Sequence, residues 1–560
     1  MTYEFDLGGY SRPVSTESAE AQAWFDRGLN WLYGFNHDEA IACFNKALLF
    51  DPQLAMAYWG LALACGPNYN IIWEAFSNEM LAVKLPEIRR YVAAAKSHMH
   101  AATPVEQALV QAIASRYQSD APPEDRAELQ QWSAAYLDAM RDVYQRFSDD
   151  PDVAALFADA ILNLTPWKLW DLRTGEPAQG AFANECKQVL ETAITALREE
   201  GGRPHPGIWH NYVHLMEMSP VPEQALPAAD DLRRLVPDAG HLMHMATHID
   251  VQCGDYQAVV DWNRAATVAD LKYWRYGGAF NTYSAYRAHN YHFQLYGAMF
   301  LGQLQPALQA VEGMGRTLPE PVLRRMPPLL REMLEPFFAT KTHALIRFGK
   351  WQQLVDEPVP ADAELYAVST AFNYYGKAIA HANLKQFDQA RDALARFEQS
   401  AGRIDQKRRM HTTRVHDIFG VAREMIYGET AYHEGNHELA FVHLRRAVEL
   451  DDALPYDEPR GWMMPTRHPL GAILLEQGHF EEAASVYEAD LGLNDTVVRA
   501  GRHPNNVWSL LGLHECYIKL GRATEAALIK PALDVALARA DPEVASSCFC
   551  SAPLGGQCCD

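Results

Sequence analysis

The chain has 560 residues, of which 48% are hydrophobic and 21% are charged, so it can bury a substantial core as several domains or one repeat array. Its formal net charge of -22 argues against a nucleic-acid partner, because a phosphate backbone selects basic proteins. No apolar run approaches the length of a membrane span, and the first residues lack the pattern of a secretory signal, so we expect a cytoplasmic protein without a membrane partner.

Residues 1–20 are expected to form an N-terminal extension, and a repeat begins at residue 21. In the segment 21–54, small residues stand at positions 8, 20 and 27 of a 34-residue frame, and a proline stands at position 32. Small residues let two helices approach closely, and the proline ends the second helix. The six signature positions are filled by Trp24, Gly28, Ala40, Phe44, Ala47 and Pro52. The segment therefore resembles a tetratricopeptide repeat, which implies a pair of antiparallel helices.

The same frame recurs further along the chain. It is occupied by Ala378, Ala390 and Leu394, by Gly428, Gly435, Ala440, Leu444 and Ala447, and by Gly471, Gly478, Ala483 and Tyr487. We therefore predict an all-α fold, a right-handed tetratricopeptide-repeat solenoid of stacked antiparallel helix pairs over residues 21–540. Longer inserts between helices are expected near residues 67–82, 166–180, 274–287 and 455–469, where Pro, Gly, Asn or Trp accumulate.

The central repeats, residues 206–321, carry histidines at recurring positions. The frame fits units that begin at Pro206, Gly240 and Ala288. Position 5 then holds His210, His244 and His292, position 9 holds His214, His248 and Tyr296, and position 2 includes His241 and His289. Residues at these spacings share one helical stripe. Packed helices lie about 8–10 Å apart, so imidazoles from adjacent helices can share an ion about 2.0–2.1 Å from each nitrogen.

In the tetratricopeptide family, positions 2, 5, 9 and 12 of the first helix line the concave groove where ligands bind. Glu217 stands at position 12 of the first central unit. The resemblance therefore implies that the seven histidines and Glu217 face one groove. A histidine-lined groove for a peptide or an anionic ligand is the alternative to a metal site.

The motifs around these histidines extend the resemblance. HNYVHLMEMSP at 210–220 and GHLMHMATHI at 240–249 contain the patterns HxxxHxxE and GHLxHMxxHI. Together with GPNYN at 66–70, PWKLW at 166–170, HNYHF at 289–293 and HPNNVWSLLGL at 503–513, they resemble a subgroup of tetratricopeptide-repeat proteins from bacteria and fungi. The similarity covers nearly the whole chain. The subgroup has no generally assigned activity, so the resemblance implies the fold and the site rather than the reaction.

An imidazole-rich set with one carboxylate and no thiolate suits copper, zinc, iron or nickel rather than magnesium or calcium. Three stripes of histidines are too broad for one ion, so two ions, or one ion beside a substrate, would fit better. Three histidines per ion is, by analogy, the arrangement of coupled dinuclear copper proteins. Glu217, as a ligand or general base, would favour iron, manganese or hydrolytic zinc instead. Tyr296 is a candidate ligand, proton donor or groove-lining aromatic.

We therefore expect a metal-dependent enzyme, an oxidoreductase with copper or iron more than a hydrolase, acting on a small molecule or peptide in the groove. The predicted metal ligands are the seven histidines, and the predicted catalytic residues are Glu217 and Tyr296. Glu217 is expected to support or bridge the histidine ligands. A non-enzymatic scaffold for a peptide or protein partner and a metal-binding or transfer protein are the alternatives. The phosphate loop, the dinucleotide fingerprint, the nucleophile elbow and HExxH do not occur in the sequence.

Residues 541–560 form a cysteine-rich C-terminal tail that contains Cys548, Cys550, Cys558 and Cys559. Four thiolates can make one tetrahedral site for Cu(I) or Zn. The paired spacing is tighter than that of a usual zinc ribbon, so a redox-active tail, a disulfide pair and an inert end remain alternatives. In a reducing compartment, stable disulfides are not expected.

Overall fold

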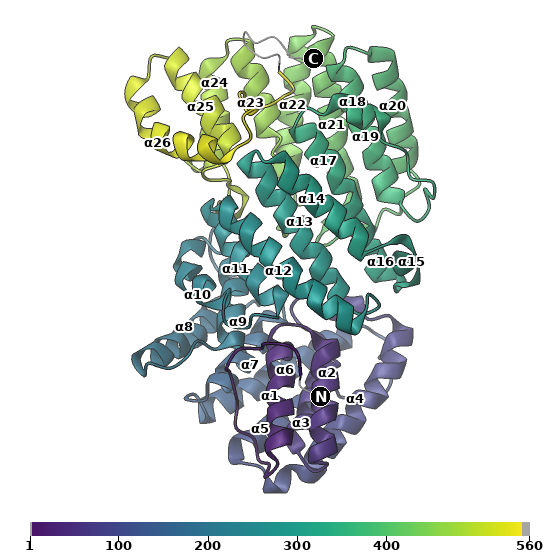
Figure 1. Ribbon diagram of the computed structural model, residues 1–560, viewed down its shortest axis with the longest axis vertical. Helices are drawn as coiled ribbons and strands as arrows, with labels where there is room; N and C mark the ends of the chain where they lie inside the picture. The colour runs from purple at the N-terminus through teal and green to yellow at the C-terminus, as the bar shows by residue number, and fades with distance from the viewer. Residues whose placement is uncertain (1–2, 552–560) are drawn as a thin grey trace. The chain divides into compact units, whose positions relative to one another are not determined.

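The computed structural model describes residues 3–551, and nearly all of its regular structure is helical (Figure 1). The predicted all-α fold is confirmed. Among the described residues the strands are β1 (Arg409–Met410) and β2 (Thr413–Arg414), which pair in an antiparallel hairpin. The chain forms two compact units. Unit 1 contains the residues up to Ile249 and Ala265–Arg287, and unit 2 contains Asp250–Arg264 and the residues from Ala288 onward.

Unit 1 is built from helices that follow one another along the chain. They are α1 (Ala19–Tyr33), α2 (His37–Phe50), α3 (Ala55–Ala64), η1 (Trp73–Ala75), α4 (Asn78–His98), η2 (Met99–Ala101), α5 (Pro104–Arg116), α6 (Ala127–Arg146), α7 (Pro151–Leu162), α8 (Ala183–Glu199), α9 (Pro206–Met216), η3 (Pro222–Ala225) and α10 (Leu226–Leu232). Helices α11 (Gly240–Cys253), α12 (Tyr256–Gly277) and α13 (Tyr283–Leu301) contribute residues to both units.

Unit 2 continues with shorter helices and then regular pairs. Its elements are α14 (Leu304–Thr317), α15 (Glu320–Arg325), α16 (Pro328–Leu334), η4 (Glu335–Ala339), α17 (Thr340–Arg347), α18 (Trp351–Asp356), α19 (Ala367–Asn383), α20 (Phe387–Ala401), the β1–β2 hairpin, α21 (Val415–His433), α22 (His437–Asp452), α23 (Arg467–Glu476), α24 (Phe480–Leu491), η5 (Arg499–Gly501), α25 (Val507–Lys519) and α26 (Ala523–Arg539).

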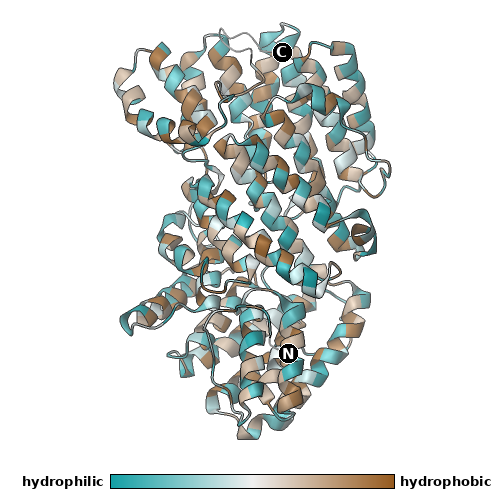
Figure 2. Ribbon diagram, viewed as in Figure 1, coloured by the Kyte–Doolittle hydropathy of each residue, from teal (hydrophilic) through white to brown (hydrophobic). Residues whose placement is uncertain are grey.

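The first repeat forms the helix pair that its frame predicts. The Ser18 side chain accepts a hydrogen bond from the Ala21 amide and starts α1, and the Asn36 side chain accepts from the Glu39 amide and starts α2. The two helices lie side by side (Figure 1). Helices throughout the chain carry both hydrophobic and hydrophilic residues around their circumference (Figure 2). Helices at the edge, such as α20, bury one stripe against their neighbours, whereas every residue of α9 is buried.

Close approach of the first helices depends on glycine. A Cβ atom on Gly28 would lie 2.6 Å from the Phe44 ring, and one on Gly60 would lie 2.7 Å from the same ring. Phe44 is fully buried. The small residue at position 8 of the frame therefore makes room for the large residue at position 24, as the sequence predicts.

We expect Gly28→Ala to lower the stability of the protein, because the added methyl group overlaps the Phe44 ring. Overpacking of this kind costs about 1–3 kcal/mol, which thermal denaturation detects as a lower Tm. Gly315→Ala is the control, since Gly315 lies in α14 and a Cβ there meets no heavy atom within 4 Å. That change should raise stability by about 0.5–1 kcal/mol. Equal effects of the two changes would contradict this description of the packing.

The predicted inserts are partly helical. Residues 78–82 belong to α4, and of the insert near 274–287 the segment 278–282 alone lies outside helices α12 and α13. The inserts near 166–180 and 455–469 remain mostly outside helices. The insert near 274–287 is shorter than expected because α12 and α13 extend into it. Turn-forming residues at the ends of a helix do not stop its last turn from forming.

The N-terminal segment is fixed to α7 by buried charges. Arg12 Nη1 lies 2.7 Å from Asp152 Oδ2 and 2.7 Å from Asp150 Oδ1. The Tyr33 hydroxyl donates to Asp152 Oδ1 at 2.5 Å. Asp152 is buried, and hydrogen bonding from His205 and the charge of Arg12 hold the pKa of its carboxyl below the usual range despite the burial. This network fixes the end of α1, where Tyr33 lies.

A buried glutamate in unit 2 makes the stability of the protein depend on pH. Glu429 in α21 is 1% exposed, and burial raises the pKa of its carboxyl from 4.5 to about 7. Asn383 Nδ2 donates to Glu429 Oε2 at 2.8 Å. Between pH 4.5 and about 7 the folded state therefore holds a proton that the unfolded state has lost. Because this raised pKa belongs to an acid, stability falls as pH rises through this window.

Glu429→Gln should remove that penalty while keeping an oxygen for the Asn383 amide. We expect the variant to be more stable than the wild type at pH 8, by about 3 kcal/mol, and to differ little from it at pH 4. Denaturant unfolding at both pH values checks this prediction. A stability difference that is the same at pH 4 and pH 8 would show that Glu429 ionises normally in the folded protein.

Candidate metal centre

Helix α9 begins at a fixed point, which determines where its histidines lie. Pro206 occupies the first turn, and His205 Nδ1 accepts hydrogen bonds from the amides of Gly207 and Ile208 at 3.1 and 3.2 Å. Nε2 of His205 lies 3.2 Å from Asp152 Oδ1 and donates to it. The cap and the proline together start the helix one turn before its first inward histidine.

Three buried histidines of unit 1 converge at one point. His210 and His214 lie one turn apart on α9, and His241 lies in the first turn of α11. One ring nitrogen from each is within 4.8 Å of the others, and the side chains are 0–1% exposed. The ring centroids of His210 and His214 are 4.8 Å apart, and those of His210 and His241 are 5.0 Å apart. This trio has the composition of an imidazole metal site.

The hydrogen bond of His210 determines which of its ring nitrogens can bind a ligand. Nδ1 donates to the backbone carbonyl of Tyr33 at 2.7 Å, so the lone pair lies on Nε2. Nε2 is buried and has no hydrogen-bond partner among the described residues. Burial lowers the pKa of His210 to about 3, so the ring is neutral at physiological pH.

His214 has the same arrangement with a carboxylate in place of the carbonyl. Its Nδ1 lies 3.0 Å from Glu217 Oε1 and donates to it, and its buried Nε2 has no partner among the described residues. Burial holds the pKa of His214 well below its usual value. A carboxylate behind a histidine fixes the tautomer and raises the basicity of the opposite nitrogen, as in known metal sites.

Glu217 connects this trio to two further histidines. Its second oxygen, Oε2, accepts from His248 Nδ1, and His248 Nε2 lies 2.8 Å from His244 Nε2. Two nitrogens that bind one tetrahedral ion at 2.0–2.1 Å lie about 3.3 Å apart. His244 and His248 are thus a hydrogen-bonded pair, and Glu217 connects this pair to His214.

Aromatic rings surround the trio. The Phe35 ring centroid is 4.4 Å from that of His210, Tyr69 is 4.3 Å from His214, and Tyr286 is 4.6 Å from His241. Phe35 has a φ of 55°, which is unusual for a bulky residue and directs its ring from the α1–α2 turn toward the histidines. The centre is therefore enclosed by apolar surface rather than open to solvent.

A cavity of about 30 Å³ lies beside His210 and is lined also by Tyr33, His37, Asn68 and Asp159. A site of roughly 10–15 Å³ holds one water molecule. The cavity thus has room for about two molecules of that size beside His210.

The sequence predicts that all seven histidines share one groove, and the structure groups five of them with Glu217 in unit 1. The remaining predicted site residues lie in unit 2. His289 is half-buried, with its ring 5.2 Å from that of Phe293. His292 Nε2 lies 3.1 Å from Met463 Sδ. Tyr296 shares a hydrogen bond of 3.2 Å with His503 Nε2 and belongs to a separate buried network.

The repeat frame gives no sign that Tyr33 and Phe35 belong to the site. Both lie where the first helix of the first repeat ends, more than 170 positions before His210 along the chain, and Tyr33 contributes a backbone carbonyl. No side-chain pattern reveals a backbone acceptor. The sequence does draw attention to Tyr69, because the GPNYN segment places this aromatic residue in an insert rich in Gly, Pro and Asn.

Residues 21–54 match the model of the tetratricopeptide repeat family. No curated protein matches the chain. The crystal structure of yeast Tom70 aligns over 91% of this chain and 98% of its own, with 11% identity and a TM-score of 0.29. The crystal structure of the APC/C hetero-tetramer Cut9-Hcn1 aligns over 77% of this chain and 74% of that one, with 13% identity and a TM-score of 0.29.

Within residues 3–551, no helix combines the length and the apolar character that crossing a membrane requires. Helix pairs that follow the 34-residue frame recur in both units, as α1–α2, α19–α20, α21–α22 and α23–α24. The matched segment shows that the chain contains a tetratricopeptide repeat, and helix pairs in the same frame recur further along it.

Proposed function

We propose that unit 1 binds a transition-metal ion through His210, His214 and His241, and that this ion is the centre of a metal-dependent enzyme. The observation that carries the proposal is the convergence of three buried imidazole nitrogens within 4.8 Å. In His210 and His214 the lone pair lies on Nε2, because Nδ1 of each ring donates a hydrogen bond.

An ion accounts for a feature that a simple hydrogen-bonded core does not. Burying a polar atom without a partner costs about 1–3 kcal/mol, and His210 and His214 each bury such an atom. A metal ion offers both lone pairs a bond at the same point. Small rotations of the rings bring nitrogens 4.8 Å apart or closer to the separation of about 3.3 Å that tetrahedral ligands have.

The donor set narrows the choice of metal. Neutral imidazoles suit copper, zinc, iron and nickel, and the trio contains neither a thiolate nor a direct carboxylate. Three protein ligands leave a fourth position, as in catalytic rather than structural zinc sites. Copper or iron would supply the oxidoreductase chemistry that we predict, and zinc would supply hydrolytic chemistry. In either case Glu217 acts as a positioning residue that orients His214, because both carboxylate oxygens are bonded to histidines.

Binding of a peptide by these histidines is the alternative. Tetratricopeptide-repeat solenoids are typical scaffolds for protein interactions, and they bind through exposed concave surfaces. The side chains of His210, His214, His241 and His244 are 0–1% exposed, so they offer no surface to a peptide. Burial therefore favours an ion over a peptide as the ligand of this cluster.

Elemental analysis by plasma mass spectrometry tests the proposal. The protein should be prepared without an affinity His-tag and with Cys548, Cys550, Cys558 and Cys559 all replaced by serine, so that the tail offers no thiolate ligand. About one equivalent of copper, iron, zinc or nickel is expected after reconstitution, because three imidazoles bind one ion. If the protein binds none of these ions after reconstitution, the cluster is a polar core and the proposed function is refuted.

A further inference from the structure

The chain does not end at its last helix, because residues 541–551 continue over unit 2. The Asp541 amide donates to the Gly302 carbonyl at 2.9 Å, and Asp541 Oδ2 accepts from the Leu304 amide at 2.7 Å. Val544 is 5% exposed, and a Cβ on Gly302 would lie only 3.0 Å from its Cγ2. The beginning of this segment is thus fixed at the turn between α13 and α14.

The end of the segment is also seated on unit 2. The hydroxyls of Ser547 and Tyr487 share a hydrogen bond of 2.5 Å. The Phe549 ring lies edge-on to Trp508, with centroids 6.1 Å apart, and its Cβ would be 2.9 Å from a Cβ on Gly349. An aromatic side chain therefore occupies the space that a glycine leaves open. We call residues 541–551 the C-terminal strap.

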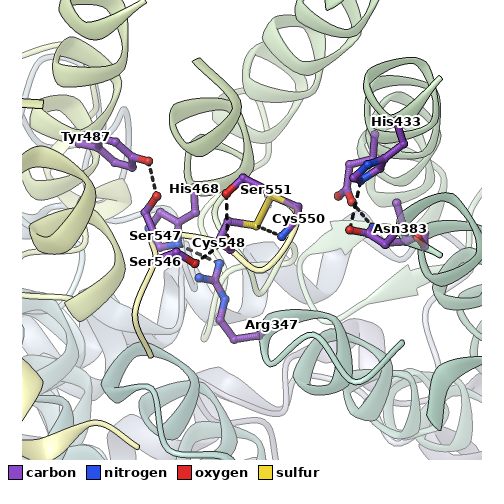
Figure 3. Close-up of a disulfide and its surroundings, with 12 residues drawn as sticks. Arg347, Asn383, His433, His468, Tyr487, Ser546, Ser547, Cys548, Cys550 and Ser551 are labelled. Atoms are coloured by element: carbon purple, nitrogen blue, oxygen red, sulfur yellow. Dashed lines mark hydrogen bonds between the residues drawn. A yellow bond between two sulfur atoms is a disulfide. The ribbon is translucent and has the colours of Figure 1, made fainter. Parts of the chain in front are cut away.

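A disulfide shapes the strap at this point. Cys548 and Cys550 are bonded, with Cα atoms 5.3 Å apart, and both are buried (Figure 3). The Cys550 amide donates to Cys548 Sγ at 3.1 Å. A bond between residues two apart holds their side chains on one side of the chain, so Phe549 between them must project to the other side. The disulfide therefore presents Phe549 in the orientation in which it meets Trp508. Cys558 and Cys559 of the predicted thiol cluster lie outside the described residues.

Beneath the strap lies a buried cation. Arg347 is 3% exposed, and its guanidinium lies beside the Ser546–Cys548 segment (Figure 3). Nη2 donates to His468 Nδ1 at 2.9 Å, and Cζ lies 4.4 Å from the centroid of the Trp508 ring. Nη1 has no hydrogen-bond partner among the described residues. Arg347 and Trp508 together form a surface that would hold a carboxylate and an apolar group, and the strap covers it.

We propose that the Cys548–Cys550 pair is a reversible thiol–disulfide site that controls whether the strap is seated on unit 2. A thiolate of the glutathione class attacks one sulfur of the disulfide and forms a mixed disulfide with one cysteine, while the other leaves as a thiolate. A second thiol resolves the mixed disulfide. The protein gains two electrons and two protons, and the small thiols are oxidised to their disulfide. Reduction raises the fraction of molecules in which the strap is open and Arg347 and Trp508 are uncovered.

The physical reason for release is preorganisation. In the oxidised state the short ring fixes the backbone around Phe549, so little freedom is lost when the ring of Phe549 docks. In the reduced state the backbone must be ordered on docking. Ordering the backbone of one residue costs enough conformational entropy to change the docking equilibrium of the strap by roughly tenfold. The open population of the strap should therefore rise at least about tenfold on reduction.

Hydrogen exchange measured by mass spectrometry on the full chain tests this inference. The background is the variant with Cys558 and Cys559 replaced by serine, which removes competing partners. The amides of residues 541–551 should exchange at least about tenfold faster in reduced than in oxidised glutathione. Peptide mass analysis after alkylation should find the Cys548–Cys550 bond only in the oxidised sample.

Two variants keep the result unambiguous. Replacing Cys548 and Cys550 by serine should give the fast exchange in both buffers, and Phe549→Ala should do so while the disulfide still forms. Equal protection in oxidised and reduced protein would overturn the inference, as would free thiols at both cysteines in oxidised glutathione. Exchange of the strap amides does not depend on the metal content of unit 1. The redox proposal can therefore fail while the metal proposal holds, and the reverse.

Discussion

Replacing His214 by alanine is expected to weaken metal binding more than any other single change in unit 1. His214 offers a buried Nε2 to the trio and also connects it to Glu217, so the variant loses a ligand and its carboxylate partner together. Loss of an outer partner alone lowers metal affinity about 10–100-fold, so loss of the ligand should exceed about 100-fold. Competition with a chelator of known affinity measures the change.

The matched control is His343→Ala. His343 lies in unit 2, is 3% exposed, and has a pKa lowered by burial to about 3, so it resembles His214 in type and environment. It should lose stability, as any large-to-small change in a core does, but keep its metal. If both variants lose metal equally, the loss reports damage to the fold and not a ligand. If His214→Ala keeps full affinity, His214 is not a ligand.

Glu217→Gln is expected to have the second largest effect, because one carboxylate serves two histidines. Its oxygens accept from Nδ1 of His214 and Nδ1 of His248. A glutamine has one oxygen and one NH₂ group, so one of the two imidazoles would face a donor and change its tautomer. In His214 that change would place the proton on Nε2, the nitrogen that faces the trio. We expect metal affinity to fall about 10–100-fold.

A second buried carboxylate provides the comparison. Glu335 in unit 2 is fully buried and accepts from the Ser369 amide and hydroxyl, far from any histidine of the trio in sequence. Glu335→Gln removes a buried charge in the same way and should leave the affinity for metal unchanged. Unchanged affinity in Glu217→Gln would mean that the carboxylate does not set the tautomer of His214.

The helix pairs were predictable because their signals are local. Gly435 and Gly478, at position 15 of their units, adopt the positive φ of a helix end at 85° and 82°. Gly428 and Leu444 stand 16 residues apart in one unit, and a Cβ on the glycine would lie 2.7 Å from the leucine side chain. Each contact lies within one repeat, so the frame alone specifies it.

The burial of the histidine cluster was not predictable in the same way. Position within a repeat placed His210 and His214 on the inner face of a helix, and the family resemblance implied an open groove. The enclosing rings come from other places in the chain: Phe35 from a turn with positive φ, Tyr69 from an insert, and Tyr286 from α13. Such contacts depend on how repeats and inserts pack, which a repeat frame does not encode.

The partners of Glu217 were less predictable than its role. Its spacing predicts a residue that supports or bridges the histidines, or else a ligand or a general base, because position 12 faces the same side as positions 5 and 9. The structure directs both of its oxygens to Nδ1 atoms of histidines. Side-chain direction at the C-terminal end of a helix depends on the neighbouring helix, and His248 is the neighbour that decides it here.

X-ray absorption at the metal edge, on the protein whose four tail cysteines are replaced by serine, tests the central claim most directly. Our description predicts nitrogen or oxygen donors at about 2.0–2.1 Å, scattering from about three imidazole rings, and no sulfur. The ring scattering should diminish in His214→Ala. Sulfur at about 2.3 Å, or a shell without imidazole scattering, would show that the metal binds elsewhere and that the histidine cluster of unit 1 is not its site.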